Sequence, residues 1–473
     1  MSKVLVFDFG ASSARAIMVE TDGKNLKTEE IHRFPNNPIT VNDTLYWDID
    51  TLLSEVKTAV IKADSYGFEA VSVDTWGVDF AIMDDEGNFV EKPVHYRDKR
   101  TADVIDEVNA LFGGADKLYM KTGIQSAWFN TIYQLYALKK TRPESLSGKV
   151  HFLMMPDLIA HYLTGSFRNE YAEATTSSLL NPETKDWDKE ILEKLGISPE
   201  IFCPMINSGE IYGFLKPEFT RRRMNIPVVA VPSHDTAAAV AAVPSEEKEF
   251  LFISTGTWAL FGTELSAPVI SEEAYKAGLT NEGGHSGTIT FLKNIMGMWL
   301  FQEIRRDFTE KGVPLSFAEM ETLARNAKPS VSFINPNDES FSQPGDMPEK
   351  VKKYVEKTGQ KPLSGISEII RCVYDSLARE FSSTLADIEK ITGKSYNKIY
   401  MFGGGTKDSL LCQLTADASG RTVVAGPTEA TSIGNALCAF VGSGAIPSVA
   451  EARKIVISAG LTKTYEPCND ALI

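Results

Sequence analysis

VLVFDFGASSARAIMVE, residues 4–20, runs from an apolar stretch through a small polar turn into a second apolar stretch. FLFISTGTWALFGTE, residues 250–264, repeats that layout. Each segment reads as two buried strands joined by a turn, and the backbone N–H groups and hydroxyls of such a turn can bind phosphate. One turn of this kind is typical of an ordinary hairpin. Two of them about 245 residues apart predict two homologous domains that face one cleft.

The rest of the chain fits this two-domain organisation. The chain has 473 residues, 43% hydrophobic and 23% charged, which is ordinary globular composition with room for two or three domains. An alanine-rich run, residues 237–243, is followed by the polar sequence PSEEKE, which places the boundary near residue 244. We therefore predict domains over residues 1–244 and 245–473. Strands such as 71–74 and 78–83, and helices such as 156–163, indicate an α/β fold of mixed sheets with covering helices.

Charge and cysteine usage exclude several classes of protein. The formal net charge is -15, and the only dense basic run, residues 221–223, is interpreted as a surface turn, so we expect no nucleic-acid partner. No apolar stretch is long enough to span a membrane and no export signal is evident, which predicts a cytoplasmic protein. The five cysteines stand at least 26 residues apart without metal-ligand spacing, so we expect no structural zinc. The sequence leaves the oligomeric state open and is compatible with a monomer.

Asp8 ends the first predicted strand and is followed by the small-residue turn. A carboxylate in that place can help to hold Mg²⁺ beside a bound phosphate, because this hard cation is usually bound by one or two carboxylates and water. A carboxylate that merely caps the turn is an equally good interpretation. Arg15, just beyond the turn, can either neutralise phosphate charge or form an ion pair at the surface.

Asp235 is the best candidate for a catalytic base. It follows an apolar strand and precedes the alanine-rich helix, between His234 and Thr236, which could bind substrate hydroxyls. A hydroxyl group that attacks a phosphoryl group needs one proton acceptor, and phosphoryl transfer otherwise depends mainly on positioning and charge neutralisation. The alternative is a structural role, since Ser233 or Asp235 would be an acceptable helix N-cap.

A glycine triplet and three polar positions complete the candidates. Residues 399–408, IYMFGGGTKD, read as a strand that enters three glycines and then a helix, where a flat ring or a phosphate can approach the backbone. The run is neither a Walker A loop nor a GxGxxG fingerprint, and a flexible turn is an equally good interpretation. Trp76, Asp79 and Asn294 could provide the aromatic face and polar groups of a sugar site, although Trp76 alone is more typical of a core.

Taken in order, these segments resemble the FGGY carbohydrate kinase family along nearly the whole chain. The segments that carry the resemblance are FDFGASSAR (7–15), VDTWGVDF (73–80), NTIYQLYAL (130–138), MPDLIAHYLTG (155–165), SHDTAAAV (233–240), LKNIMGMWLFQE (292–303) and GGGTKDSLLCQLTADASG (403–420). The resemblance implies two actin-like, ribonuclease H-like domains that close on ATP and Mg²⁺, with ATP and a sugar in the interdomain cleft. It further implies phosphorylation of L-rhamnulose at its 1-hydroxyl group, in rhamnose catabolism.

The resemblance also assigns roles to individual residues. It implies that Asp235 is the proton acceptor and that Asp8 orients the metal ion and its water. The residues that it implies for sugar binding are Gly77, His234, Asp235, Thr236 and Asn294. The residues that it implies for nucleotide binding are Ala11, Ser12, Ser13, Ala14, Arg15, Thr257, Gln302 and Gly404.

Two departures and two alternatives accompany these expectations. Ala14 stands where similar sequences often have a second glycine, and Ala259 stands where the family segment usually has serine, so the nucleotide site can differ in detail. Another FGGY kinase, acting on fuculose, xylulose or glycerol, is one alternative, because sugar choice depends on a few hydroxyl contacts. The other is an actin-like or chaperone-like switch ATPase. The segments TWGVDF and LKNIMG favour rhamnulose.

Overall fold

The computed structural model describes residues 1–222 and 225–468, and these divide into two compact units. Unit 1 contains residues 1–246, 265–291 and 431–460, and unit 2 contains residues 247–264, 292–430 and the chain from 461 onward. Each unit is therefore built from segments that are separated in sequence. The boundary near residue 244 remains a prediction, because it divides the chain once along the sequence, whereas each unit combines separated segments.

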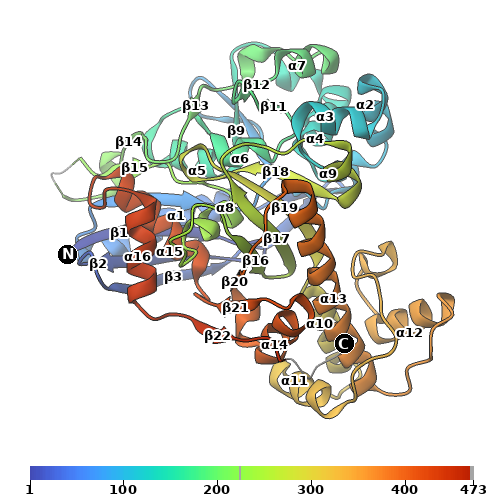
Figure 1. Cartoon of the computed structure of the whole chain (residues 1–473). Coiled ribbons are helices and arrows are strands. Elements are labelled where there is room, and N and C mark those ends of the chain that lie inside the picture. Colours follow the sequence, from blue (N-terminus) through green and yellow to red (C-terminus); the bar gives the residue numbers. More distant parts are fainter. Residues whose placement is uncertain (223–224, 469–473) are drawn as a thin grey trace. The chain divides into compact units, whose positions relative to one another are not determined.

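Unit 1 is centred on a six-stranded sheet in the order β14-β15-β6-β1-β2-β3. Figure 1 shows β1, β2 and β3 side by side, and the ladder pairs β1 with β2 antiparallel and with β6 parallel. The bounds of these strands are β1 Ser2–Phe9, β2 Ser13–Thr21, β3 Leu26–Pro35, β6 Ala70–Asp74, β14 Ile211–Phe214 and β15 Pro227–Val229. Because β1 and β6 are buried on both faces, they read in sequence as continuous apolar runs.

Smaller sheets and helices surround this sheet. The further strands of unit 1 are β4 Pro38–Val41, β5 Thr44–Trp47, β7 Phe80–Asp84, β8 Phe89–Glu91, β9 Val150–Met154, β10 Asn169–Glu170, β11 Leu180–Asn181, β12 Asp186–Trp187, β13 Met205–Ile206 and β18 Leu279–Gly283. Its helices are α1 Ile49–Ala63, α2 Ile105–Phe112, α3 Ala115–Thr122, α4 Thr131–Thr141, α5 Met155–Thr164, α6 Tyr171–Thr175, α7 Lys189–Leu195, α8 Asp235–Ala241, α9 Glu272–Ala277, α15 Ala430–Gly442 (from residue 431) and α16 Val449–Ser458.

Local sequence explains how α1 covers the sheet. Asp48 caps the helix by accepting a hydrogen bond from the backbone N–H of Thr51. Leu52, Val56 and Val60 recur at helical spacing and are buried, so they present one apolar face. That face packs against β1, β2 and β3, and α5 packs against β6 and β14. The core of unit 1 therefore lies between these helices and the sheet.

Unit 2 repeats the arrangement of a mixed sheet with helices. Its strands lie in the order β19-β17-β16-β20-β21-β22, where β16 and β17 are the antiparallel pair predicted from residues 250–264. The strands are β16 Leu251–Thr255, β17 Trp258–Leu265, β19 Ile289–Met296, β20 Lys398–Phe402, β21 Thr422–Ala425 and β22 Lys463–Tyr465. The helices are α10 Trp299–Glu310, α11 Phe317–Asn326, α12 Met347–Lys357, α13 Ile366–Thr392 and α14 Ser409–Ser419. The predicted α/β fold of mixed sheets with covering helices is confirmed.

Two expectations about local segments need comment. The strand predicted over residues 78–83 begins only at Phe80, because Val78 has a φ of 73° and cannot continue a strand. In the basic run, Arg222 donates to Asp64 and lies over the Phe68 ring, and Arg223 lies outside the described residues. Within the described ranges, no helix has the length and apolar character needed to cross a membrane.

Candidate active site

Two carboxylates meet where neighbouring strands of unit 1 end. Asp8 on β1 and Asp74 on β6 are paired positions of the parallel ladder, so their side chains lie on the same face of the sheet. Burial, together with the charge of Asp8, raises the pKa of Asp74 well above its usual value. Asp74 Oδ1 is buried without a hydrogen-bond partner among the described residues. Such a pair of like charges favours a bound cation or proton.

Side chains distant in sequence hold this carboxylate pair. Ser432 Oγ donates to Asp8 Oδ2 at 2.5 Å, and Arg15 Nη2 donates to the same oxygen at 2.7 Å. Asn435 Nδ2 donates to Asp74 Oδ2, also at 2.5 Å. Asp8 thus accepts hydrogen bonds from side chains of β2 and α15. In the described part of the chain, no contact supports the alternative that Asp8 caps its turn.

Asp235 is the first residue of α8, but its carboxylate does not cap the helix. The N-cap residue is His234, and no side chain makes a capping hydrogen bond there among the described residues. Backbone bonds fix the segment: Thr75 N donates to Ser233 O at 2.8 Å, and Asp235 N donates to Thr75 O at 2.9 Å. Because no capping hydrogen bond forms within the described chain, the structural alternative of a helix cap is wrong. The Asp235 side chain is partly buried, with 36% exposed, so the carboxylate is accessible.

The pKa of Asp235 is shifted upward. Burial of the carboxylate raises this pKa. The charge of the neighbouring His234 lowers the pKa, and the charge of Asp8 raises it. Thr236 Oγ1 donates to Asp235 Oδ1 at 3.1 Å. His234 Nε2 lies 3.5 Å from the same oxygen. A carboxylate with a raised pKa is a better proton acceptor than an ordinary surface aspartate.

A cluster of buried acidic side chains contacts the segment 233–235 through Glu170. Glu170 Oε2 accepts hydrogen bonds at 3.0 Å from the backbone N–H groups of Ser233 and Glu173. Burial raises the pKa of Glu170 to about 7, and burial together with the charge of Asp157 raises the pKa of Glu173 well above its usual value. Burial likewise raises the pKa of Asp157, whose Oδ1 accepts from Tyr212 Oη at 2.6 Å. Glu170 therefore ties the segment before Asp235 to the core of unit 1.

The segment from Trp76 to Asp79 is held in an unusual conformation. Asp79 accepts side-chain hydrogen bonds from Trp47 and Trp76 at 2.6 and 3.0 Å, so this carboxylate stabilises the turn, and Trp76 is only 6% exposed. Val78 N donates to Thr176 Oγ1 at 3.1 Å, which helps to hold the positive φ of Val78. A β-carbon on Gly77 would come within 3.0 Å of Thr176 Oγ1, so a larger residue would not fit there without movement of the threonine. The glycine keeps this backbone close to α6.

The predicted phosphate turn of unit 1 links β1 and β2. Gly10 N donates to Ser13 O at 3.0 Å, and Asn36 Nδ2 donates to Gly10 O at 2.9 Å. Ala11 and Ser12 at the tip of the turn are exposed. Ala14 pairs with Phe9 in the ladder and is fully buried, so its β-carbon is part of the core.

Unit 2 contains predicted site residues near the turn between β16 and β17 and elsewhere in the unit. Met298 N donates to Gly256 O at 3.1 Å and Trp299 N donates to Thr257 O at 3.0 Å, so the turn rests on the start of α10, where Gln302 lies one turn further on. Gly404 is exposed and a β-carbon on it would meet nothing within 4 Å. Asn294 is exposed on β19. Ala259 is buried, and a β-carbon on Gly297 would lie 2.7 Å from its backbone nitrogen.

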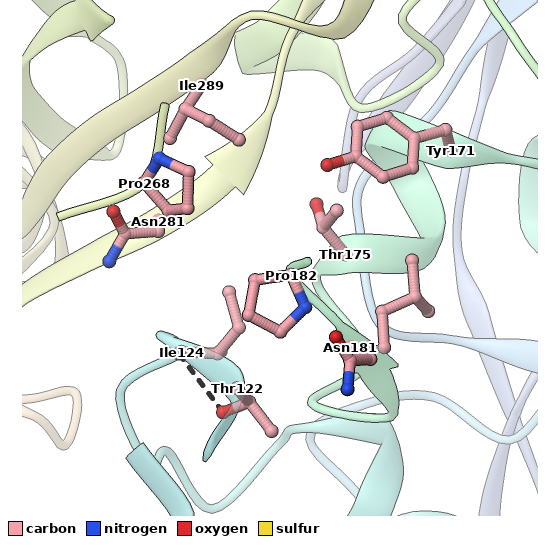
Figure 2. A pocket seen from close by; sticks show the side chains of 10 residues that line it. Thr122, Ile124, Tyr171, Thr175, Asn181, Pro182, Pro268, Asn281 and Ile289 are labelled. Atoms are coloured by element: carbon pink, nitrogen blue, oxygen red, sulfur yellow. Dashed lines mark hydrogen bonds between the residues drawn. The ribbon is translucent and has the colours of Figure 1, made fainter. Parts of the chain in front are cut away.

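Figure 2 shows a pocket elsewhere in unit 1, with the Tyr171 hydroxyl directed into it and Thr122 bonded to the backbone of Ile124. Its empty volume is about 310 Å³, part of which is open to solvent. Thr175 and Asn281 line it, but both also bond to neighbouring backbone. None of the site residues predicted from sequence lines this pocket.

Sequence reasoning missed the partners of the candidate acids. Ser432 and Asn435 stand more than 350 positions from the aspartates that they contact, and Glu170 and Glu282 are ordinary glutamates in their local sequences. Glu282 Oε2 lies 3.2 Å from His234 Nδ1. Ser432 and Asn435 fall on α15, the second α-helix after the glycine triplet, so the triplet gave only an indirect signal.

Comparison with known proteins identifies the family of this chain. The model of the N-terminal domain of the FGGY family of carbohydrate kinases matches residues 3–241. The model of the family's C-terminal domain matches residues 251–443. The chain belongs to the FGGY family of carbohydrate kinases. It is therefore a carbohydrate kinase, as the resemblance in its sequence segments implied.

Individual relatives are similar along their whole length. A protein of Halalkalibacterium halodurans named rhamnulokinase is 41% identical, covering 98% of this chain and 99% of that protein. A rhamnulokinase of Bacteroides thetaiotaomicron is 37% identical, covering 97% and 95%.

Solved structures show the same fold at much lower identity. A ligand-bound xylulose kinase from Lactobacillus acidophilus has a TM-score of 0.81 at 16% identity, covering 99% of this chain and 94% of that one. A glycerol kinase of Plasmodium falciparum with ADP has a TM-score of 0.82 at 13% identity, with the same coverage.

Proposed function

We propose that this carbohydrate kinase transfers the γ-phosphoryl group of ATP to the 1-hydroxyl group of L-rhamnulose, with Asp235 as the proton acceptor. The observation that carries the proposal is the Asp235 carboxylate, which is accessible, does not cap α8 and has a raised pKa. The relatives named rhamnulokinase support the choice of sugar, because the similarity extends along both chains.

In the proposed reaction, Asp235 accepts the proton of the sugar hydroxyl while the oxygen forms its bond to phosphorus and the bond to ADP breaks. The base must be held within hydrogen-bond distance of the hydroxyl, so a carboxylate on a rigidly held backbone segment is suited to this role. The two backbone bonds between Thr75 and the segment 233–235 provide that rigidity. The sugar would then be bound by Gly77, His234, Thr236 and Asn294.

Nucleotide binding is proposed for the two turns and the glycine triplet. In unit 1 the residues are Ala11, Ser12, Ser13, Ala14 and Arg15, and in unit 2 they are Thr257, Gln302 and Gly404. The exposed tip of the first turn and the open space at Gly404 support the proposal, because phosphates and a flat ring need close access to the backbone. Arg15 would act through its ion pair with Asp8.

The residues around Asp8 fit Mg²⁺. Asp8 and Asp74 offer carboxylate oxygens side by side, and the buried Asp74 Oδ1 has no hydrogen-bond partner among the described residues. One or two carboxylates together with water and phosphate oxygens are a usual environment for this ion. When bound, Mg²⁺ would neutralise phosphate charge. Because ATP is the phosphoryl donor of the cytoplasm, we expect the enzyme to work there.

The test is ADP release by the purified protein with ATP, Mg²⁺ and, in turn, L-rhamnulose, L-fuculose, D-xylulose and glycerol. We expect the highest kcat/KM with L-rhamnulose. A preference for another sugar of the panel would contradict the proposed substrate and retain the kinase chemistry. ADP release that does not depend on any sugar would contradict the proposed reaction.

A further inference from the structure

His234 lies between two carboxylates of unit 1. Its Nδ1 is 3.2 Å from Glu282 Oε2, and its Nε2 is 3.5 Å from Asp235 Oδ1. Nδ1 of His234 and Oε2 of Glu282 are both buried, and neither makes a hydrogen bond of good geometry among the described residues, so their contact is an ion pair. At this distance the nitrogen and the carboxylate oxygen can satisfy each other, and leaving either buried atom unsatisfied would be costly.

The backbone on both sides of Glu282 is fixed. Asn281 Nδ2 donates to Gly123 O at 3.1 Å, and Asn281 Oδ1 accepts from Val269 N at 2.7 Å. Gly283 N donates to Thr175 Oγ1 at 2.8 Å. A β-carbon on Gly283 would lie 2.8 Å from the α-carbon of Ala172, so β18 is in close contact with α6 at this point. The backbone of Glu282 therefore cannot move away from His234 without disrupting the contacts of both neighbours.

This geometry determines which imidazole nitrogen carries the proton. Glu282 lies closer to Nδ1, at 3.2 Å, than Asp235 lies to Nε2, at 3.5 Å, so the proton of the neutral ring is assigned to Nδ1 and the lone pair to Nε2, on the side of Asp235. Burial lowers the pKa of His234, but Glu282 and Asp235, with a further contribution from Glu170, raise it above its usual value. Asp8 also acts on Asp235, and Asp235 interacts electrostatically with Asp74 and Glu173. The ring is thus placed to become an imidazolium between two carboxylates.

We propose that Glu282 is a positioning residue for phosphoryl transfer, holding His234 so that Nε2 receives the proton that Asp235 takes from the sugar. This inference rests on the proposed function. The sugar O–H bond breaks and an O–H bond forms on Asp235. That bond then breaks as an N–H bond forms on His234 Nε2, and the Glu282 carboxylate stabilises the resulting imidazolium. The proton leaves His234 for water, which returns Asp235 to its carboxylate form.

The proposal separates the contribution of His234 to catalysis from a contribution to sugar binding. If the ring only binds a sugar hydroxyl, loss of the Glu282 charge weakens binding and raises KM. If the ring also receives the proton, loss of that charge lowers kcat as well, because the Glu282–imidazolium interaction is made only after the proton has moved.

The test compares Glu282→Gln with a matched control, Glu91→Gln. Glu91 is likewise a buried carboxylate of unit 1, paired with Arg142 at 2.8 Å and Ser145 at 2.6 Å. We expect Glu282→Gln to lower kcat roughly tenfold or more, within the range of proton-transfer catalysis, whatever the change in KM for the sugar. Glu91→Gln should retain wild-type kcat. Thermal unfolding of both variants checks that each one is folded.

A second measurement does not depend on turnover. The pKa of His234 is followed by NMR titration, with its signal assigned by comparison with His234→Gln. We expect a lower pKa in Glu282→Gln than in the wild type, because a neutral amide no longer stabilises the charged ring. An unchanged pKa, or a rise in KM with wild-type kcat, would overturn the proposal. Absence of sugar-dependent turnover in the wild type would instead refute the proposed function, while the titration would still report the Glu282–His234 pair.

Discussion

Asp235 lies at the start of α8, but its side chain does not cap the helix. An aspartate at the start of a helix usually accepts backbone hydrogen bonds as an N-cap. Here His234 occupies the N-cap position and the Asp235 carboxylate remains accessible. Asp79, also considered for sugar binding, instead accepts hydrogen bonds from two tryptophans and stabilises its own turn.

The raised pKa of Asp235 predicts how activity depends on pH. A proton acceptor works only as the carboxylate, so kcat/KM should fall as the pH decreases through the pKa of the unliganded enzyme. Because burial raises this pKa, the acid limb should lie above the ordinary range of aspartate. The measurement is kcat/KM for L-rhamnulose across the acid range. An acid limb at or below the pKa of an unperturbed aspartate would contradict this prediction.

At the scale of elements, the three glycines after β20 have different structural constraints. Gly403 has a φ of 89°, and a β-carbon there would lie 2.7 Å from Thr255 O. A β-carbon on Gly405 would lie 2.7 Å from the Thr255 β-carbon. Gly404 has open space and begins the short helix Gly404–Lys407. A β-carbon would clash at the two outer glycines, whereas the middle one has space for a side chain.

This difference predicts separate effects of two substitutions. Gly404→Ala should change the free energy of unfolding by no more than about 0.5 kcal/mol, because its β-carbon meets nothing. It should raise KM for ATP roughly tenfold, equivalent to about 1.4 kcal/mol of binding. Gly403→Ala should destabilise the protein by about 1–3 kcal/mol, the usual cost of a strained backbone. Denaturant unfolding and ATP titration of kcat measure the two effects.

Gly365→Ala is a suitable control, because this glycine also has open space and has an extended φ of -157° at the N-cap of α13. We expect wild-type KM for ATP in this variant. If Gly404→Ala binds ATP as the control does, Gly404 is not a nucleotide contact.

Helices and strands that depend on residues nearby in the sequence could be predicted from the sequence. The strand–turn–strand segments are confirmed as β1–β2 and β16–β17, and the helix predicted over residues 156–163 is confirmed as α5. The late start of β7 could not be predicted, because Val78 is β-branched and favours strands. Its positive φ depends on a hydrogen bond from its backbone N–H to Thr176, 98 positions away.

At the scale of the whole molecule, the parts of the site that escaped prediction are contacts between distant segments. Ser432 reaches Asp8 across 424 positions, and Glu282 reaches His234 from a strand with no motif of its own. Such contacts exist only once the chain has folded, so the local sequence around each residue carries no sign of them. The identities of Asp8 and Asp235 as candidates were accessible because strand ends and helix starts are local features.

The buried acids predict how stability depends on pH. The folded state raises the pKa of Glu170 to about 7 and also raises those of Glu173, Asp157 and Asp74, so it binds more protons than the unfolded state in this range. Stability should therefore decrease as the pH rises from 6.5 to 8, by roughly 1.4 kcal/mol per pH unit for each proton of difference. Below pH 6.5, buried histidines such as His95, whose pKa burial lowers to about 4, oppose this trend.

Denaturant unfolding at several pH values measures this slope. Glu170→Gln removes one of the titrating groups and keeps an oxygen that can accept from Ser233 N, so the decrease between pH 6.5 and 8 should become smaller. A stability that rises with pH over this interval, or a slope unchanged in the variant, would contradict the account of the buried acids.

The central claim is that Asp235 accepts the proton of the sugar hydroxyl, and the most direct test is the turnover of Asp235→Asn. The substitution keeps the shape of the side chain and removes its basicity. Formation of L-rhamnulose 1-phosphate is measured beside calorimetric binding of the nucleotide. We predict that kcat falls by at least about 100-fold, the scale of a lost general base, while nucleotide binding and thermal stability are retained. Turnover near the wild-type rate would contradict the claim.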